Sequence, residues 1–420
     1  MPPLPPSSAT VLPAGPAGSA FRHRSFKLFW CARVAGMLAV QMQVVAVGWQ
    51  IYELTDSALA LGMVGLFQFL PSLALALVAG HVVDSRDRRR VLLAAVGLQA
   101  VAIAALCVLT AAGALAAMPV LVYAVVAVIG AAKAFEGPGN QAILSALVPP
   151  ADLPNAVAWN SSATQTAMVT GPALGGLLYI AGPAVVYATS ALLLAGAVLF
   201  IALLRPRRVA QAPRAMSWES LMAGIGFIRG QRAILGAITL DMVAVLLGGA
   251  TALLPVFARD ILHVGPEGMG VLRAAPAIGA VAMAVVLARV GVRRHAGAWM
   301  LAGVAGFGAA TVLFGLSTDP VLSFFALIAI GATDQVSVVV RMTLIQLATP
   351  DDVRGRVGAV NSLFIGASNQ LGEFESGVAA TLLGVVPAVV LGGVGAIALA
   401  AGWARLFPEL RRIDRLTELR

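Results

Sequence analysis

Long apolar segments alternate with short polar segments along most of the chain. Each apolar segment has about 20 residues or more, the length that an α-helix needs to cross the ~30 Å apolar core of a bilayer. We predict membrane spans at 27–52, 58–83, 90–112, 118–144, 154–181, 183–204, 232–258, 267–289, 295–317, 320–347, 356–383 and 386–407. These twelve segments predict an all-α integral membrane protein.

The composition agrees with this prediction. Apolar residues make up 60% of the 420 residues and charged residues only 11%, whereas about 25% is usual for a soluble domain. The net charge of +9 raises the question of a nucleic-acid partner. The basic residues, however, fall in groups between the apolar segments, so their positions indicate topology and we expect no nucleic-acid partner.

The distribution of Lys and Arg predicts the orientation. Cytoplasmic loops near helix ends are enriched in basic residues. If the N-terminus is cytoplasmic, 23 of the 28 Lys and Arg residues lie on the cytoplasmic side and only Arg259 lies on the other. Four lie within spans: Arg33, Lys133, Arg273 and Arg341. We expect a multi-pass protein with the lipid bilayer as its surroundings and both termini in the cytoplasm.

The longest polar connection divides the spans into two sets of six. We expect a disordered tail at 1–20, a six-helix bundle at 21–204, a linker with a possible amphipathic helix at 205–231, a second bundle at 232–407 and a basic tail at 408–420. Pro150-Ala151-Asp152 before the fifth span resembles Pro350-Asp351-Asp352 before the eleventh, 200 residues later. This weak repeat favours two pseudo-symmetric six-helix bundles.

The connection between the second and third spans carries the most specific motif. Its residues Gly80, Asp84, Arg88 and Arg89 match the signature of the major facilitator superfamily, which this segment resembles, while Ser85 and Asp87 depart from it. The resemblance implies a gate, in which Gly80 allows close helix approach and Asp84 faces a helix N-terminus across the domain interface. The alternative is a basic loop that only sets topology.

A second motif lies in the fifth span. Gly171, Pro172, Gly175 and Gly176 resemble the core of the antiporter motif of the same superfamily, although the earlier glycine of that motif is Ala167 here. Pro172 should kink the helix and the glycines should allow a tight helix seam. A generic kinked helix is the alternative. Together the motifs resemble the branch of bacterial permeases that contains the enterobactin exporter and drug exporters, and this resemblance implies a location in a bacterial inner membrane.

Charged and amide residues inside the spans are candidates for proton or substrate sites, because such groups are costly in a membrane. Lys133 and Glu136 share a helix face, so they could pair, or Glu136 could carry a proton while Lys133 tunes it. Asp334 and Arg341 are too far apart along their helix for a direct pair. Other candidates are Glu373 and Asn369 on one face, and Arg33 and Gln43 in a polar stripe directed at a central cavity.

The sequence also limits the function classes. It has no phosphate-binding loop, and its four His residues are scattered, so we expect no ATPase activity, no metal site, no cofactor and no enzyme. The resemblance implies a monomeric secondary transporter. We expect proton-coupled efflux of a small amphiphilic molecule, such as a drug or a siderophore. The alternatives are an importer or uniporter of a polar nutrient, and a non-transporting scaffold or sensor.

Overall fold

The computed structural model covers residues 1–420, and its described parts are 18–205, 218–291 and 294–414. Within these parts the chain forms helices and no strands. The expected disordered tail therefore lies almost entirely outside the described residues, as do residues 206–217 of the expected linker. The long helices of the first half are α1 (Arg24–Thr55), α2 (Ala58–Ser85), α3 (Arg88–Ala111), α5 (Leu121–Leu147), α6 (Leu153–Tyr179) and α7 (Pro183–Ala202).

The second half repeats this pattern. Its long helices are α9 (Arg232–Leu247), α11 (Pro266–Val290), α12 (Ala296–Leu316), α13 (Pro320–Ala348), α14 (Asp351–Leu383) and α15 (Val385–Leu406). Short elements join or flank them: η1 (Ser19–Arg22), α4 (Ala114–Ala117), η2 (Pro150–Asp152), α8 (Trp218–Gly230), α10 (Leu254–Val256) and α16 (Pro408–Arg411). The predicted all-α fold with twelve spans is confirmed.

The seventh span differs in detail from the single helix expected at 232–258. After α9 the chain continues through a 3-10 turn (Gly249–Leu253), α10 and a π-helical turn (Phe257–Ile261). Two adjacent glycines, Gly248 and Gly249, and then Pro255 interrupt the regular hydrogen bonding there. The span is still complete by length, because the whole segment from Arg232 to Ile261 is apolar and long enough to cross a membrane.

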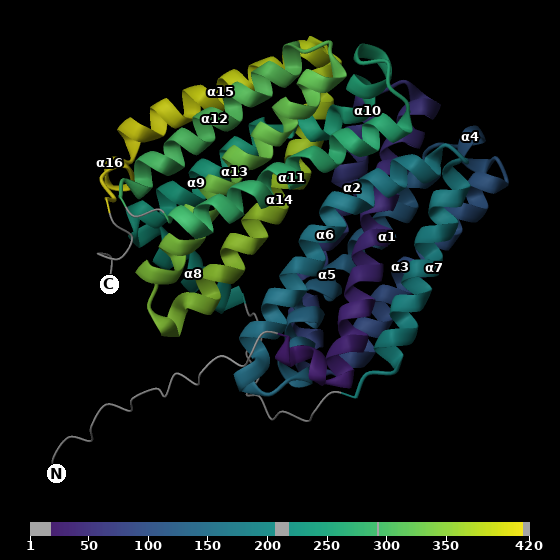
Figure 1. Ribbon diagram of the computed structural model, residues 1–420, viewed down its shortest axis with the longest axis horizontal. Helices are drawn as coiled ribbons and strands as arrows, with labels where there is room; N and C mark the ends of the chain where they lie inside the picture. Colours follow the sequence, from purple (N-terminus) through teal and green to yellow (C-terminus); the bar gives the residue numbers. More distant parts are fainter. Residues whose placement is uncertain (1–17, 206–217, 292–293, 415–420) are drawn as a thin grey trace.

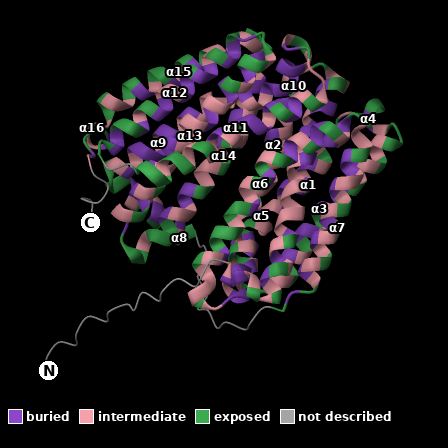
Figure 2. Ribbon diagram, viewed as in Figure 1, coloured by how far each residue is buried: buried purple, intermediate pink, exposed green. Residues whose placement is uncertain are grey.

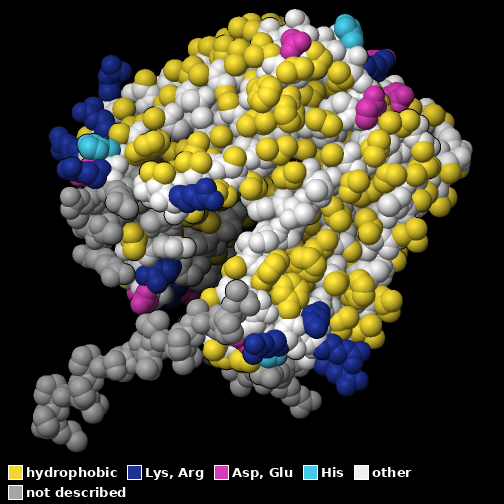
Figure 3. All heavy atoms as spheres, in the orientation of Figure 1, with side chains coloured by type: hydrophobic (Ala, Val, Ile, Leu, Met, Phe, Trp, Pro, Cys, Tyr) yellow, Lys and Arg dark blue, Asp and Glu magenta, His cyan; other side chains and the backbone are white. Residues whose placement is uncertain are grey.

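Ten of the described helical segments are both long and apolar enough to span a membrane. The remaining long helices, α6 and α14, carry more polar residues and lie between the two halves of the molecule, where they contact α11 and α2 respectively. Large apolar side chains such as Leu192, Val101 and Leu382 are exposed on the outside. Figures 2 and 3 show such exposed and apolar residues over the flanks, as expected for a lipid-facing surface.

Helices α1–α7 form one half of the molecule and α9–α15 the other (Figure 1). We call the end where α1 begins and α15 ends the terminal end, and the opposite end the far end. The halves meet through two helix pairs, α2 with α14 and α6 with α11. They lie together at the far end and diverge toward the terminal end (Figure 1).

Helix α8 lies at the terminal end of the second half. Its residues Leu221 and Ile228 are buried, and Gly224 lies against the Arg356 carbonyl of α14, while Trp218 is exposed. A helix with one buried and one exposed face was the expectation for this part of the linker.

Candidate functional site

A large cavity lies between the two halves. It has a volume of about 950 Å³ and is lined by α2, α5, α13 and α14. The space-filling view shows the molecule hollowed between its halves on the side of the termini (Figure 3). Lys133, Arg354 and Asp84 are the charged residues in its wall, and amide or hydroxyl side chains line it too, among them Ser72, Gln141, Ser145, Gln346, Asn361, Ser362 and Gln370. Its volume suits a ligand of drug size or larger.

The far end is closed by two glycine seams. In the seam between α6 and α11, a Cβ atom on Gly176 would lie 2.3 Å from the Pro266 carbonyl oxygen, and one on Gly270 would lie 2.5 Å from that of Pro172. Between α2 and α14, Gly62 and Gly377 face each other in the same way, with a Cβ on Gly377 2.9 Å from Gly62 Cα. Backbones this close leave no room for a passage.

The predicted glycine motif is divided between two partners. Gly176 and Pro172 face α11 across the halves, whereas Gly171 and Gly175 pack on Gln41 and Met42 of α1 within the first half. The tight seam expected from the sequence is therefore present at both faces of α6.

Polar contacts at the far end also join the halves. Arg259 Nη1 donates to Asp56 Oδ1 at 2.7 Å, and its guanidinium lies 5.4 Å from the centre of the Tyr52 ring. The Tyr52 hydroxyl donates to Asp260. Because Tyr52 and Asp56 belong to the first half and Arg259 and Asp260 to the second, we call these four residues the far-end latch. Sequence reasoning missed it, although Arg259 was the single basic residue expected on that side.

The signature motif lies at the terminal end. Gly80 and Asp84 line the cavity, opposite Arg354 and Gly355 at the start of α14. In the part of the chain that the structure describes, no cation lies within 4.0 Å of the Asp84 carboxylate to form an ion pair. Asp84 therefore faces the start of α14 across the cavity without an ion pair, and its role in a gate stays a prediction.

The two arginines of the motif act within the first half. Arg88 Nη1 donates to the Ala142 carbonyl of α5 at 3.2 Å. Arg89 Nε donates to the Ile201 carbonyl at 3.1 Å, and its Nη2 donates to Ala202. Arg89 therefore caps the C-terminal end of α7, where a positive charge is favourable.

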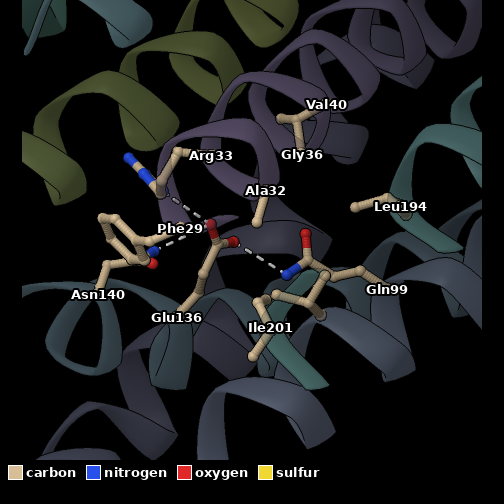
Figure 4. Close-up of a pocket in the computed structure, with 11 residues that line it drawn as sticks. Phe29, Ala32, Arg33, Gly36, Val40, Gln99, Glu136, Asn140, Leu194 and Ile201 are labelled. Atoms are coloured by element: carbon tan, nitrogen blue, oxygen red, sulfur yellow. Dashed lines mark hydrogen bonds and ion pairs between the residues drawn. The ribbon is translucent and has the colours of Figure 1, made fainter. Parts of the chain in front are cut away.

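Glu136 lies in a partly buried polar cluster inside the first half (Figure 4). Its Oε1 accepts from Arg33 Nη1 at 3.1 Å and from Asn140 Nδ2 at 3.3 Å, and its Oε2 accepts from Gln99 Nε2 at 3.0 Å. The expected pair with Lys133 is not formed, because Glu136 is directed toward α1 and α3. Gln99 is a partner that sequence reasoning missed, and a lone amide in an apolar helix was its only signal.

Lys133 points to the cavity wall instead. Its Nζ donates to Gln68 Oε1 of α2 at 3.4 Å. The polar stripe expected on α1 is also wrong as a cavity lining: Arg33 faces the cluster of Glu136, and Gln43 is only 2% exposed. Arg33 also donates from Nε to Asn160 Oδ1 of α6 at 3.2 Å, so both of its carboxylate and amide partners lie in its own half.

A second buried cluster lies in the second half. Arg341 Nη1 donates to Asp241 of α9, and Ser337 Oγ donates to the other oxygen of Asp241 at 2.9 Å. Arg341 is 2% exposed. Asp334, one turn before Ser337, is an electrostatic neighbour of both members of this pair. The expectation that Arg341 pairs outside its own helix is confirmed by this contact.

Glu373 lies at the interface of the halves. A Cβ atom on Gly65 of α2 would be 2.7 Å from Glu373 Oε2, and the electrostatic neighbours of Glu373 are Arg273 and Lys133. Asn369, expected on the same face, is exposed, and its amide donates to the Ile365 carbonyl of its own helix at 3.0 Å. Gln370 forms the cavity wall at this level instead.

Two carboxylates at the terminal end, Asp152 and Asp414, form hydrogen bonds that involve residues near the chain ends. The pKa of Asp152 lies below its usual value, because the Ser19 hydroxyl and the His23 ring stabilise the charged carboxylate; His23 Nε2 lies 2.8 Å from Asp152 Oδ2. A hydrogen bond from the His295 backbone N–H, at 2.9 Å, lowers the pKa of Asp414 in the same way. Within the described residues, no three His, Cys, Asp or Glu side chains are grouped as metal ligands.

Two six-helix halves around a cavity that is open at one end and closed at the other define a multi-pass membrane transporter. The chain belongs to the transmembrane secretion effector family, whose profile matches residues 16–418, and so to the major facilitator superfamily. The predicted resemblance is confirmed.

Named relatives agree with this assignment. The chain is 27% identical over 414 residues to the enterobactin exporter EntS of Shigella dysenteriae serotype 1 (strain Sd197), covering 95% of this chain and 93% of that protein. It is also 27% identical over 413 residues to EntS of Escherichia coli O81 (strain ED1a), with the same coverage of 95% and 93%.

Solved structures share the fold. The nucleoside transporter NupG matches with a TM-score of 0.69 and 14% identity, over 91% of this chain and 99% of that one. A bacterial homologue of the human lysosomal transporter Spinster, inward-facing and unoccupied, matches with 0.70 and 13%, over 94% and 99%. A D-xylose-proton symporter matches with 0.67 and 14%, over 92% and 98%. At these identities the likeness concerns the fold alone.

Proposed function

We propose that this protein is a proton-coupled exporter of small amphiphilic molecules, such as drugs or siderophores, in a bacterial inner membrane. The observation that carries the proposal is the cavity, which is open at the terminal end, where the basic residues gather. The positive-inside rule assigns this end to the cytoplasm, with both chain termini. Substrate would enter there, and a monomer suffices because one chain encloses the cavity.

Export is favoured over import by the relatives. The two EntS proteins are named as exporters of enterobactin, a siderophore, and the family is described by secretion. A nutrient importer or uniporter remains the second candidate, because a proton symporter shares the fold. A scaffold without flux has no use for charged clusters buried in both halves.

Glu373 is our first candidate for the proton carrier, ahead of Glu136 and Asp334. It lies between α2 and α14, which must separate when the far end opens, and Gly65 leaves room for its carboxylate. Neutralising a charge at a seam between the halves changes the energy of that seam, so proton binding there can be coupled to rocking. The side chains of Glu136 and Asp334, by contrast, lie within single halves.

Proteoliposomes with an imposed pH gradient test the proposal. The unsubstituted protein should move an amphiphilic dye against its gradient only while protons flow the opposite way. Glu373→Gln should abolish this pH-driven accumulation and retain downhill dye movement. Glu375→Gln is the matched control, since Glu375 is two residues along the helix and lies 3.5 Å from the Ser376 hydroxyl.

The outcomes separate the candidates. Dye transport that ignores the pH gradient would remove the proton coupling, and dye moving in the same direction as protons would support the importer. If Glu136→Gln or Asp334→Asn alone reproduces the loss, the carrier is that residue and not Glu373.

A further inference from the structure

We propose that Lys133 is the counter-ion for an acidic group of the transported molecule, so that the cavity selects anionic amphiphiles. This inference rests on the proposed transport function and deepens it by naming a substrate class. It starts from the position of Lys133 on α5. Lys133 on α5, Phe69 on α2 and Gln370 on α14 are the cavity-lining residues nearest the far end of their helices. Lys133 therefore lies at the closed, inner end of the cavity.

The ammonium group of Lys133 has little compensation from the protein. An ammonium carries three donors, and the hydrogen bond from Lys133 Nζ to Gln68 Oε1 is a long one, at 3.4 Å. Among the described residues, no carboxylate lies within 4.0 Å of it as an ion pair. A charge in the membrane interior is costly unless a partner is provided.

The nearby carboxylates already have other cations. Glu136 is bonded to Arg33 at 3.1 Å and accepts from two amides as well. Glu373 has Arg273 as a further electrostatic neighbour. Lys133 and its neighbours therefore make up three cations and two anions: Lys133, Arg33, Arg273, Glu136 and Glu373. One positive charge is in excess, and it faces the cavity at Lys133.

The rest of the wall does not cancel this charge. Arg354 and Asp84 are the other charged lining residues. Both lie at the terminal end, where Arg354 is already paired with Asp351 at 2.5 Å. Between them and Lys133 the wall is apolar or carries neutral amides and hydroxyls, as at Leu73, Met342 and Gln141. A molecule with an apolar body and one carboxylate, sulfonate or acidic phenol group matches this arrangement.

A pair of probes with one aromatic skeleton tests the selection. We would titrate 1-anilinonaphthalene-8-sulfonate and its uncharged parent N-phenyl-1-naphthylamine into the full chain in nanodiscs of zwitterionic lipid, with empty nanodiscs subtracted. Lys133→Gln should weaken binding of the sulfonate by about tenfold or more and leave the neutral probe within about twofold, while Lys133→Arg keeps the preference. Lys27→Gln, which alters an exposed lysine, is the matched control.

A second variant keeps the lysine. Gln68→Glu would place a carboxylate where the amide now accepts from Lys133, and it should abolish the preference for the sulfonate just as Lys133→Gln does. Equal loss of both probes, or an unchanged ratio of their affinities in both variants, would overturn the proposal. Loss of the sulfonate preference when the nanodiscs contain phosphatidylglycerol would also overturn it, because a lipid headgroup would then be the occupant.

Failure of this inference can be told apart from failure of the proposed function. The titrations use no gradient, so selective binding without pH-driven transport would leave the anion site standing and remove the coupling. Transport of both probes at equal rates, driven by the pH gradient, would remove the anion site and leave the proton coupling standing.

Discussion

The far-end latch makes a quantitative prediction about which state the transporter occupies. Arg259→Gln removes the ion pair with Asp56 and the contact with the Tyr52 ring. The two side chains of the ion pair are 38% and 71% exposed, so solvent reduces its contribution to about 0.5 kcal/mol. The ring contact adds about 0.5 to 1 kcal/mol. Loss of both should raise the population with an open far end by roughly five- to tenfold.

Spin labels on the two halves can measure this shift. Ala112 and Thr318 are exposed at the far end, one after α3 and one after α12. With both native cysteines, Cys31 and Cys107, replaced by serine, labels at these two positions report the separation of the halves by electron–electron double resonance. Arg259→Gln should add or enlarge a long-distance component.

A control distinguishes the latch from a general loss of surface charge. Arg232 forms an ion pair of similar geometry with Glu409, at 3.0 Å, but within the second half at the terminal end. Arg232→Gln should leave the label distances unchanged. If Arg259→Gln also leaves them unchanged, the glycine seams alone hold the far end closed and the energetic role of the latch is refuted.

Three further predictions follow from the packing and the charges. Gly176→Ala should destabilise the closed far end by about 1 to 3 kcal/mol and lengthen the same label distances. Gly196→Ala on α7, with no atom within 4 Å of its Cβ, should leave these distances unchanged. Equal effects of the two variants would show that the glycine seam does not hold the far end closed. Arg341→Met should lower stability by about 3 to 5 kcal/mol in thermal unfolding, and adding Asp241→Asn should recover much of the loss, because the charge left behind by the single change is removed; additive losses would contradict this. The Ser19 hydroxyl and the His23 ring beside Asp152 lower the pKa of its carboxyl group. Their stabilisation is therefore complete above the ordinary carboxyl pKa of about 4 and is lost as the pH falls through the lowered value. The protection factor of the Ala20 amide, which donates to Asn155, should fall at that acidic pH, and in Asp152→Asn this protection factor should not change across the same pH range.

The spans could be predicted because hydropathy and charge act over whole helices. About 20 apolar residues satisfy the bilayer whatever their tertiary neighbours are, so twelve spans followed from the pattern alone. The interruption of the seventh span did not follow from the hydropathy pattern, although Gly248, Gly249 and Pro255 are its local cause. Glycine and proline within apolar helices are also tolerated without a break, as Pro172 in α6 shows.

The partners of the buried charges were harder to predict. Lys133 and Glu136 share a helix face by spacing, but spacing gives only the direction in which a side chain leaves the helix. Glu136 turns to Arg33 on α1, 103 residues earlier, and Lys133 turns to Gln68 on α2. The helices that surround a given side chain depend on how the whole bundle packs. A single sequence does not give this packing.

The arrangement of these charges explains how one chain can hold a stable bundle and still move. Two charged clusters, around Glu136 and around Asp241, lie each within one half and are closed by short hydrogen bonds, so rocking leaves them intact. The contacts that must break lie between the halves. They are glycine backbones in van der Waals contact and the far-end latch, which consists of an exposed ion pair, a cation–ring contact and one tyrosine hydrogen bond. Glu373 is the exception, a carboxylate at a seam, and under the proposed function this difference is why a proton on Glu373 would decide when the seam opens.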